Sequence, residues 1–184
     1  MRLGVSMLSQ SEGGTNFSIG GVELEQKLWN GGRFHAELPI SSGQLQSDAG
    51  DSSPVNRNGM AIRAELEQPL GLRNTVLHGR YARTDEGFFN PYGATTVQGV
   101  QSRSASVETR GFGSSRLSFG IEQEVNRNSI VDNKRQTISA KLTETLSENL
   151  SLETGIDRRA FEDHLSGQQI DSELISAGLK WKPL

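Results

Sequence analysis

Few groups of residues in this sequence have the types and spacing that catalysis or metal binding would require. The segment His35-Ala36-Glu37 has the His-x-Glu spacing of zinc deaminases, in which the histidine binds the metal and the glutamate transfers protons. Those enzymes also need a Pro-Cys-x-x-Cys segment, and this chain contains no cysteine. We therefore interpret His35 and Glu37 as polar residues that share one face of a strand.

The remaining residues that could do chemistry are scattered. His78 and His164 stand alone, and the chain has no Gly-x-Ser-x-Gly elbow, phosphate-binding loop or dinucleotide fingerprint. Acidic residues in two polar segments offer oxygen ligands to calcium, but without the ligand spacing of a calcium loop: Asp48, Asp51, Asp85 and Glu86. We expect no enzymatic activity, no catalytic residues, no cofactor and no metal site.

The charged residues instead follow the period of β-strands, most clearly over residues 136–159. Ile138, Ala140 and Leu142 alternate with polar residues, and the same alternation resumes at Leu152 after a short polar turn. Such alternation is typical of a strand with two unlike faces. It predicts a hairpin in which Leu142 lies opposite Thr154 and Ala140 opposite Ile156. Parity then places Leu146 opposite Leu150, with a three-residue loop over residues 147–149 and Asn149 in the left-handed region.

The same pattern runs through the chain and predicts an all-β antiparallel up-and-down meander of about ten strands, as a single domain over residues 1–184. The expected strands cover approximately residues 2–9, 17–29, 34–40, 60–67, 77–81, 104–110, 117–122, 136–146, 150–159 and 175–182. Connections alternate between short turns, near Gly31, Gly71, Ser114 and Glu148, and longer polar segments such as 41–58 and 85–99. Short turns therefore gather at one end of the sheet and long loops at the other.

Three local features refine this prediction. Phe17 and Ile19 are out of phase with Val22 and Leu24, so we expect a β-bulge at Gly20-Gly21. The turn at 30–32 should place Gly32 in the left-handed region. Pro39 cannot donate to a ladder, so its strand should fray or lie at an edge of the sheet.

The two faces of the predicted sheet are unlike, which bears on where the chain resides. A soluble sandwich buries its apolar face, whereas a transmembrane barrel turns that face to lipid and its charged face to the lumen. Strands of about 9–11 residues, an even strand count, alternating turn lengths and a hydrophobic content of 33% favour the barrel. The predicted lumen-lining residues are Glu23, Glu25, Glu37, Arg63, Glu65, Arg80, Glu108, Arg110, Glu122, Lys141, Glu153 and Asp157.

Aromatic residues give a further prediction, because transmembrane barrels carry aromatic belts at both interfaces. Phe34 and Trp181 are in phase with the apolar face at the short-turn end, and Phe17 and Tyr81 near the long-loop end. Phe119 is in phase at mid-strand. Trp29, Phe112 and Phe161 are out of phase and are expected at the rims.

Composition restricts the function classes further. The formal net charge is −3 and no basic patch emerges, so we expect no nucleic-acid partner. The lack of cysteine fits a reducing compartment or a bacterial envelope protein that avoids thiols. No cleavable apolar segment follows Met1-Arg2, so we expect either that the chain is not exported or that its N-terminus is missing.

Three segments resemble the barrel portion of large bacterial outer-membrane proteins, as do the first forty residues. They are GRYARTDEGFFNPYGATTV (79–97), SAKLTETLSENLSLETGIDRRAF (139–161) and SAGLKWKP (176–183). The resemblance implies a location in the bacterial outer membrane, with its lipid bilayer as partner. In that family the barrel is usually the membrane part of a longer polypeptide. The chain ends in Lys-Pro-Leu without a terminal aromatic, so the resemblance also implies partner strands or domains outside this sequence.

The leading hypothesis is an outer-membrane β-barrel, or a ten-strand piece of one, that acts as an anchor or a pore. The alternative is a soluble antiparallel barrel or curled sheet that binds a ligand or protein partner on one face. The inward charges either stabilise a solvated lumen or set the selectivity of a pore. Acidic residues dominate on the second to fourth strands, which would favour cations.

Overall fold

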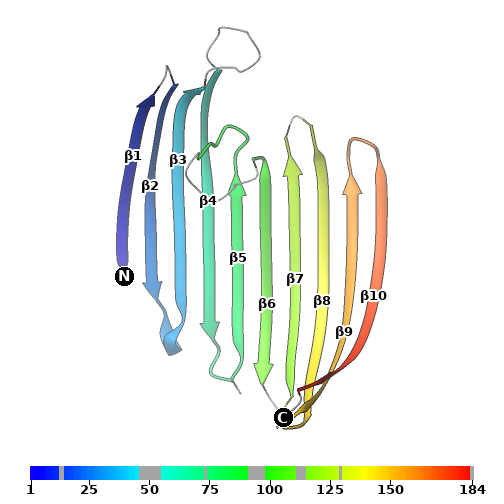
Figure 1. Cartoon of the computed structure of the whole chain (residues 1–184). Helices are drawn as coiled ribbons and strands as arrows, with labels where there is room; N and C mark the ends of the chain where they lie inside the picture. The colour runs from blue at the N-terminus through cyan, green and yellow to red at the C-terminus, as the bar shows by residue number, and fades with distance from the viewer. Residues whose placement is uncertain are drawn as a thin grey trace.

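The computed structural model describes residues 1–12, 15–45, 55–72, 74–90, 98–110, 115–128 and 130–182, and these residues form one antiparallel sheet (Figure 1). Its ten strands pair in sequence order from β1 to β10, which confirms the predicted all-β up-and-down meander. The strands are β1 (Arg2–Glu12), β2 (Thr15–Lys27), β3 (Arg33–Leu45), β4 (Val55–Pro69), β5 (Val76–Thr84), β6 (Val100–Arg110), β7 (Arg116–Arg127), β8 (Asp132–Ser147), β9 (Leu150–Asp163) and β10 (Gln168–Trp181).

The sheet is open. β1 and β10 lie at opposite edges in Figure 1, and neither has a second neighbour. β3 and β4 are longer than predicted and extend into the polar segment 41–58, of which residues 46–54 lie outside the described part of the chain. Within the described residues, no helix is long and apolar enough to cross a membrane.

The predicted bulge at Gly20-Gly21 is absent. The ladder between β1 and β2 is continuous, with Gly20 paired to Met7 and Gly21 to Ser6. Without a bulge, Phe17 lies on the face opposite Val22, where it pairs with Gln10 and Gly43. The change of apolar phase along β2 has another cause. Residues 85–90 pack against Phe17 on the face of the sheet opposite Val22.

Two turn geometries also differ from prediction. Gly32 has a φ of −64°, and the left-handed residues of that turn are Asn30 (φ 52°) and Gly31 (φ 78°), which belong to the short 3-10 helix η1 (Trp29–Gly31). In the β8–β9 hairpin, Leu142 pairs with Thr154 and Ala140 with Ile156 as predicted.

The end of that hairpin is different. Ser147, rather than Leu146, pairs with Leu150, and a register shift between Thr145 and Ser147 leaves Leu146 unpaired. The turn is therefore Glu148-Asn149, and Asn149 is not left-handed, since the only described non-glycine residues with positive φ are Asn30 and Asn74. Because Leu146 is left unpaired within β8, Ser147 joins the ladder and the predicted three-residue loop is shortened to two residues.

Pro39 lies in an interior strand rather than at an edge. β3 is hydrogen-bonded to both β2 and β4, and Pro39 keeps its pairing with Gly21 on the β2 side. On the β4 side the ladder passes from the pair Glu37–Arg63 to the pair Ile40–Met60 and omits the two residues between them. The interruption is local because proline lacks one donor but leaves the register unchanged.

The most buried part of the described chain is where residues 85–90, which follow β5, fold back over β4 toward β3 (Figure 1) and reach Phe17 of β2. The Phe88 side chain is only 2% exposed, and the Phe89 ring meets Phe17 edge to face at 5.8 Å. The Phe89 amide donates a 3.0 Å hydrogen bond to Ser41 Oγ. These contacts bury Phe17, which explains why an aromatic residue occupies this face of β2.

Glycine at position 59 makes this close approach possible. A Cβ on Gly59 would overlap the backbone of Gly87 and Phe88. Gly59→Ala should therefore lift the loop, at a cost of roughly 1–3 kcal/mol for an overpacked contact. Hydrogen exchange should become faster at the Phe88 and Phe89 amides. Gly178→Ala is the matched control, because nothing lies within 4 Å of its added Cβ. Equal exchange in the two variants would show that the loop is not held at Gly59.

Candidate functional site

One face of the sheet carries a continuous stripe of apolar residues, here called the apolar band. Strand register places these residues on the same face of neighbouring strands. The apolar band comprises Leu3, Val5, Met7, Gly20, Val22, Leu24, Phe34, Ala36, Leu38, Ile40, Met60, Ile62, Ala64, Leu66, Leu77, Gly79, Tyr81, Ala105, Val107, Thr109, Leu117, Phe119, Ile121, Ile138, Ala140, Leu142, Leu152, Thr154, Ile156, Ile175, Ala177, Leu179 and Trp181.

The apolar band is open to the surroundings at its edges and in its middle. Val5 is 78% exposed, Phe119 53% and Ile175 75%. No described segment covers these side chains. Large exposed apolar surfaces are typical of sites that contact a protein, a membrane or a ligand.

The apolar band crosses the sheet at an angle to the strands. We follow directly paired residues across the sheet, starting from Leu3 in β1. The paired residues are apolar as far as β5, but the partner in β6 is Arg103 and the partner in β10 is Asp171. That path runs through Leu3, Leu24, Ala36, Ala64, Tyr81, Arg103, Gln123, Gln136, Ala160 and Asp171. On β10 the band lies instead around Leu179 and Trp181, about eight to ten residues further along that strand.

This displacement measures the inclination of the strands relative to the band. At ~3.3 Å per residue and ~4.8 Å per strand, a drift of about eight to ten residues over about nine interstrand steps gives ~31–37°. The strands of transmembrane barrels tilt by ~35–45° from the barrel axis. A level apolar layer around this sheet therefore requires nearly the same tilt.

The opposite face, here called the charged face, carries the residues that the sequence predicted to line a lumen. Register places all of them on this face: Glu23, Glu25, Glu37, Arg63, Glu65, Arg80, Glu108, Arg110, Glu122, Lys141, Glu153 and Asp157. The same stretches of strand thus carry exposed apolar side chains on one side and exposed charges on the other.

Two ion-pair clusters occupy the charged face of β2 to β5. His35 Nε2 lies 3.2 Å from Glu23 and 3.5 Å from Glu37. Arg63 Nη2 lies 2.7 Å from Glu65 Oε1, and Arg80 Nε lies 3.9 Å from the same oxygen. His35 therefore forms a cross-strand ion pair with Glu23 and a same-strand pair with Glu37, in agreement with the interpretation of His35 and Glu37 as polar residues of one strand face.

Further pairs continue the pattern across β6 to β9. Glu108 pairs with Arg110 and Arg116, and Arg135 lies 3.2 Å from Glu124. Lys141 Nζ lies 3.0 Å from Glu153, diagonally across the β8–β9 hairpin. Acidic and basic residues alternate closely, so the charged face is a mixed-charge surface.

Three of the four predicted belt aromatics lie on the face that bears the apolar band. Phe34 pairs with Gln26 and Leu66, Tyr81 with Ala64 and Arg103, and Trp181 with Leu150. Phe17 does not, and its prediction as a belt residue is wrong because the bulge that would have brought it to this face is absent. Phe161 lies on the charged face, paired with Arg135 and Ile170, and Phe112 lies outside the described residues.

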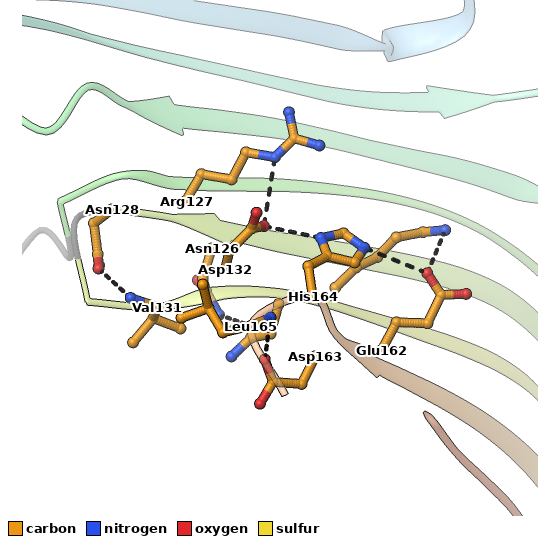
Figure 2. A network of polar contacts seen from close by, with 11 residues as sticks. Asn126, Arg127, Asn128, Val131, Asp132, Glu162, Asp163, His164 and Leu165 are labelled. Carbon is orange, nitrogen blue, oxygen red and sulfur yellow. Dashed lines mark hydrogen bonds and ion pairs between the residues drawn. The ribbon is translucent and has the colours of Figure 1, made fainter. Parts of the chain in front are cut away.

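A polar network joins the long-loop ends of β7, β8 and β9 (Figure 2). His164 Nδ1 lies 3.0 Å from Asp132, whose carboxylate also lies 3.7 Å from Arg127. The Ser166 hydroxyl and the Leu165 and Ser166 amides donate to Asp163 and lower the pKa of its carboxyl group. These contacts fix the turn after β9.

Among the described residues, no group of histidine and acidic side chains is arranged to hold a metal ion. Asp85 pairs with Arg83 at 3.2 Å, whereas Asp48 and Asp51 lie outside the described part of the chain.

Two features escaped the sequence analysis. One is the folding of residues 85–90 onto the charged face, for which Gly59 and the Gly87-Phe88-Phe89 segment were the available signals. The other is a row of polar residues that borders the apolar band, made by Tyr81, Arg103, Gln123 and Gln136. The sequence indicates this row only through Arg103, which stands two residues before Ala105 and therefore on the same face of its strand.

Comparison with known proteins adds no identity: no protein-family model matches the chain, and no curated protein matches it.

Glu65 is the shared acceptor of the Arg63–Glu65–Arg80 cluster and offers a test of it. Glu65→Gln should lower the free energy of unfolding by roughly 0.2–1 kcal/mol at low salt, because the pairs are exposed and screened. The loss should shrink as salt is added. Glu67→Gln is the control, since Glu67 makes no ion pair among the described residues. Urea unfolding of both variants at two salt concentrations measures the effect; equal losses would contradict a specific cluster.

Proposed function

We propose that this chain forms part of the wall of a bacterial outer-membrane β-barrel and acts there as a membrane anchor or pore, without catalysis. The observation that carries the proposal is the inclined apolar band. A flat layer of lipid can cover that band only when the strands tilt by about the angle that transmembrane barrels adopt. Strand tilt of this size is typical of closed barrels in general, soluble ones included, so the exposure of the apolar band is what favours lipid over a soluble barrel.

The charged face supports the same proposal. Its ion pairs lie at the same height along the strands as the apolar residues on the other side, as Lys141 and Ala140 illustrate. Side chains such as Arg63 and Glu65 keep between two fifths and half of their surface exposed. In a barrel they would line the aqueous interior, with the short turns on the periplasmic side and the long connections outside.

The two open edges require partner strands in a membrane. Hydrocarbon offers no partner for backbone amides and carbonyls, so an unpaired strand edge costs several kcal/mol for each orphan group. Every residue of β10 is exposed, and the apolar band continues to Trp181 at that edge. The proposal therefore includes further strands, from a longer chain or by closure of β1 on β10.

Two neighbouring substitutions on β8 test the assignment of the two faces. Ala140 lies in the middle of the apolar band, between Phe119 and Ile156. Ala140→Arg should make insertion less favourable by roughly 2–4 kcal/mol, the cost of arginine near the bilayer midplane. Ser139→Arg lies on the charged face beside Asp157 and should be tolerated. Folding into phosphatidylcholine vesicles under a urea titration compares them; equal tolerance would contradict the face assignment.

Partitioning separates this proposal from the alternative, a soluble sheet whose open apolar face binds a protein or ligand. The exposed apolar band is the observation that keeps the alternative in view. The membrane protein should need detergent or vesicles to remain dispersed and should acquire protease protection in vesicles. A chain that stays monomeric in buffer and does not enter vesicles would contradict the membrane proposal. For a chain that inserts, conductance across a planar bilayer distinguishes a pore from an anchor.

A further inference from the structure

A row of directly paired residues on four neighbouring strands forms the border of the apolar band on the side of the long loops. Tyr81, Arg103, Gln123 and Gln136 pair directly from β5 to β8, and they are here called the polar row. Two residues closer to the short turns on each strand, the same face carries only apolar residues: Gly79, Ala105, Ile121 and Ile138. The boundary between polar and apolar side chains is therefore sharp here and follows one line of pairing.

The border contains a hollow with an apolar floor and a polar rim. A volume of about 260 Å³ is lined by Arg103, Ser104, Ala105, Ile121, Gln123 and Gln136. The small Ala105 side chain creates the depression, because its paired neighbour Gly79 adds no side chain beside it. Ile121 forms the opposite wall. The hollow lies on the face that carries the apolar band, away from the charged face.

Arg103 supplies a positive charge at this hollow. Its Nε donates a 2.6 Å hydrogen bond to Gln123 Oε1, which orients the guanidinium group along the polar row. No carboxylate of the described residues forms an ion pair with it. Of the other cations on this face, Arg83 lies 3.2 Å from Asp85, whereas Arg158 of β9, paired with Ile138, forms no ion pair among the described residues. Arg103 is the one cation among the residues that line the hollow, so an anion in the hollow would meet its charge directly.

We propose that the polar row binds the phosphate-bearing headgroup of a membrane lipid, whose acyl chain lies over Ala105 and Ile121. The inference rests on the proposed function, because it needs this face to contact lipid. A guanidinium fork and amide donors match phosphate oxygens, and a tyrosine is well suited to the border between hydrocarbon and water. The apolar floor favours a lipid over free phosphate, which would leave Ala105 and Ile121 uncovered.

Lipid retention measures this site directly. The full chain is folded into nanodiscs of phosphatidylcholine with or without phosphatidylglycerol, and the lipids that stay bound after release are identified by native mass spectrometry. The wild type should retain phosphatidylglycerol in preference to phosphatidylcholine. Arg103→Gln should weaken that retention on the order of tenfold, because a charge-assisted contact to phosphate is lost. Inorganic phosphate added in millimolar excess should not displace the lipid.

Two variants complete the test. Arg83→Gln removes a cation that Asp85 already neutralises and should retain phosphatidylglycerol like the wild type. Arg103→Lys keeps the charge but loses the planar fork, so its retention should be intermediate. If the chain inserts but Arg103→Gln and Arg83→Gln behave alike, or if the wild type shows no preference, the lipid site is refuted while the membrane role stands. Displacement by inorganic phosphate would identify an anion site without lipid specificity. A chain that does not insert at all would refute the proposed function itself.

Discussion

The antiparallel register is the constraint on which the rest of the structure depends. Successive side chains of a strand point to opposite faces, so one continuous pairing phase commits each residue to one of two environments. The pairing phase is the same from β1 to β10, and the missing pairs beside Pro39 do not change it. It shifts only near Leu146 of β8, outside the part of that strand that carries the apolar band. The apolar band and the charged face are both consequences of this single phase.

The described chain has almost no internal core, and most of its large apolar side chains are exposed. Its buried hydrophobic residues are Phe17, Ala61 and Phe88: Phe17 and Phe88 belong to the contact between residues 85–90 and the charged face, and Ala61 lies on that face two residues from Gly59. Exposed ion pairs contribute little each, and the backbone ladder must offset a large loss of chain entropy. Burial of the apolar band by something outside the chain is therefore the missing stabilising term. In the proposed membrane barrel, lipid would supply that burial.

Alternation in the sequence was sufficient to predict the strands and both faces, since it depends only on neighbours along the chain. It failed at Phe17, because the partner that makes an aromatic residue acceptable there is Phe89, which is distant in sequence. The left-handed residue assigned to Asn149 failed for a related reason, as an irregularity inside β8 changed the length of the turn. The polar row of Arg103 depends on the relative stagger of four strands, and stagger cannot be obtained from any one strand alone.

The stagger also limits how the sheet can be completed. Pairing of β1 with β10 in the register that joins Leu3 to Leu179 would bring Met7 to Ile175 and preserve both faces. The same register would set Arg2 opposite Lys180, a like-charge pair that destabilises the junction. It would also require the sheet to curl until its edges meet, whereas β1 and β10 lie at opposite edges of an open sheet (Figure 1). Additional strands that continue the drift of about one residue per strand would preserve the tilt without that curvature. For the proposed membrane barrel, the open geometry therefore favours a larger barrel in which this sheet would be one arc.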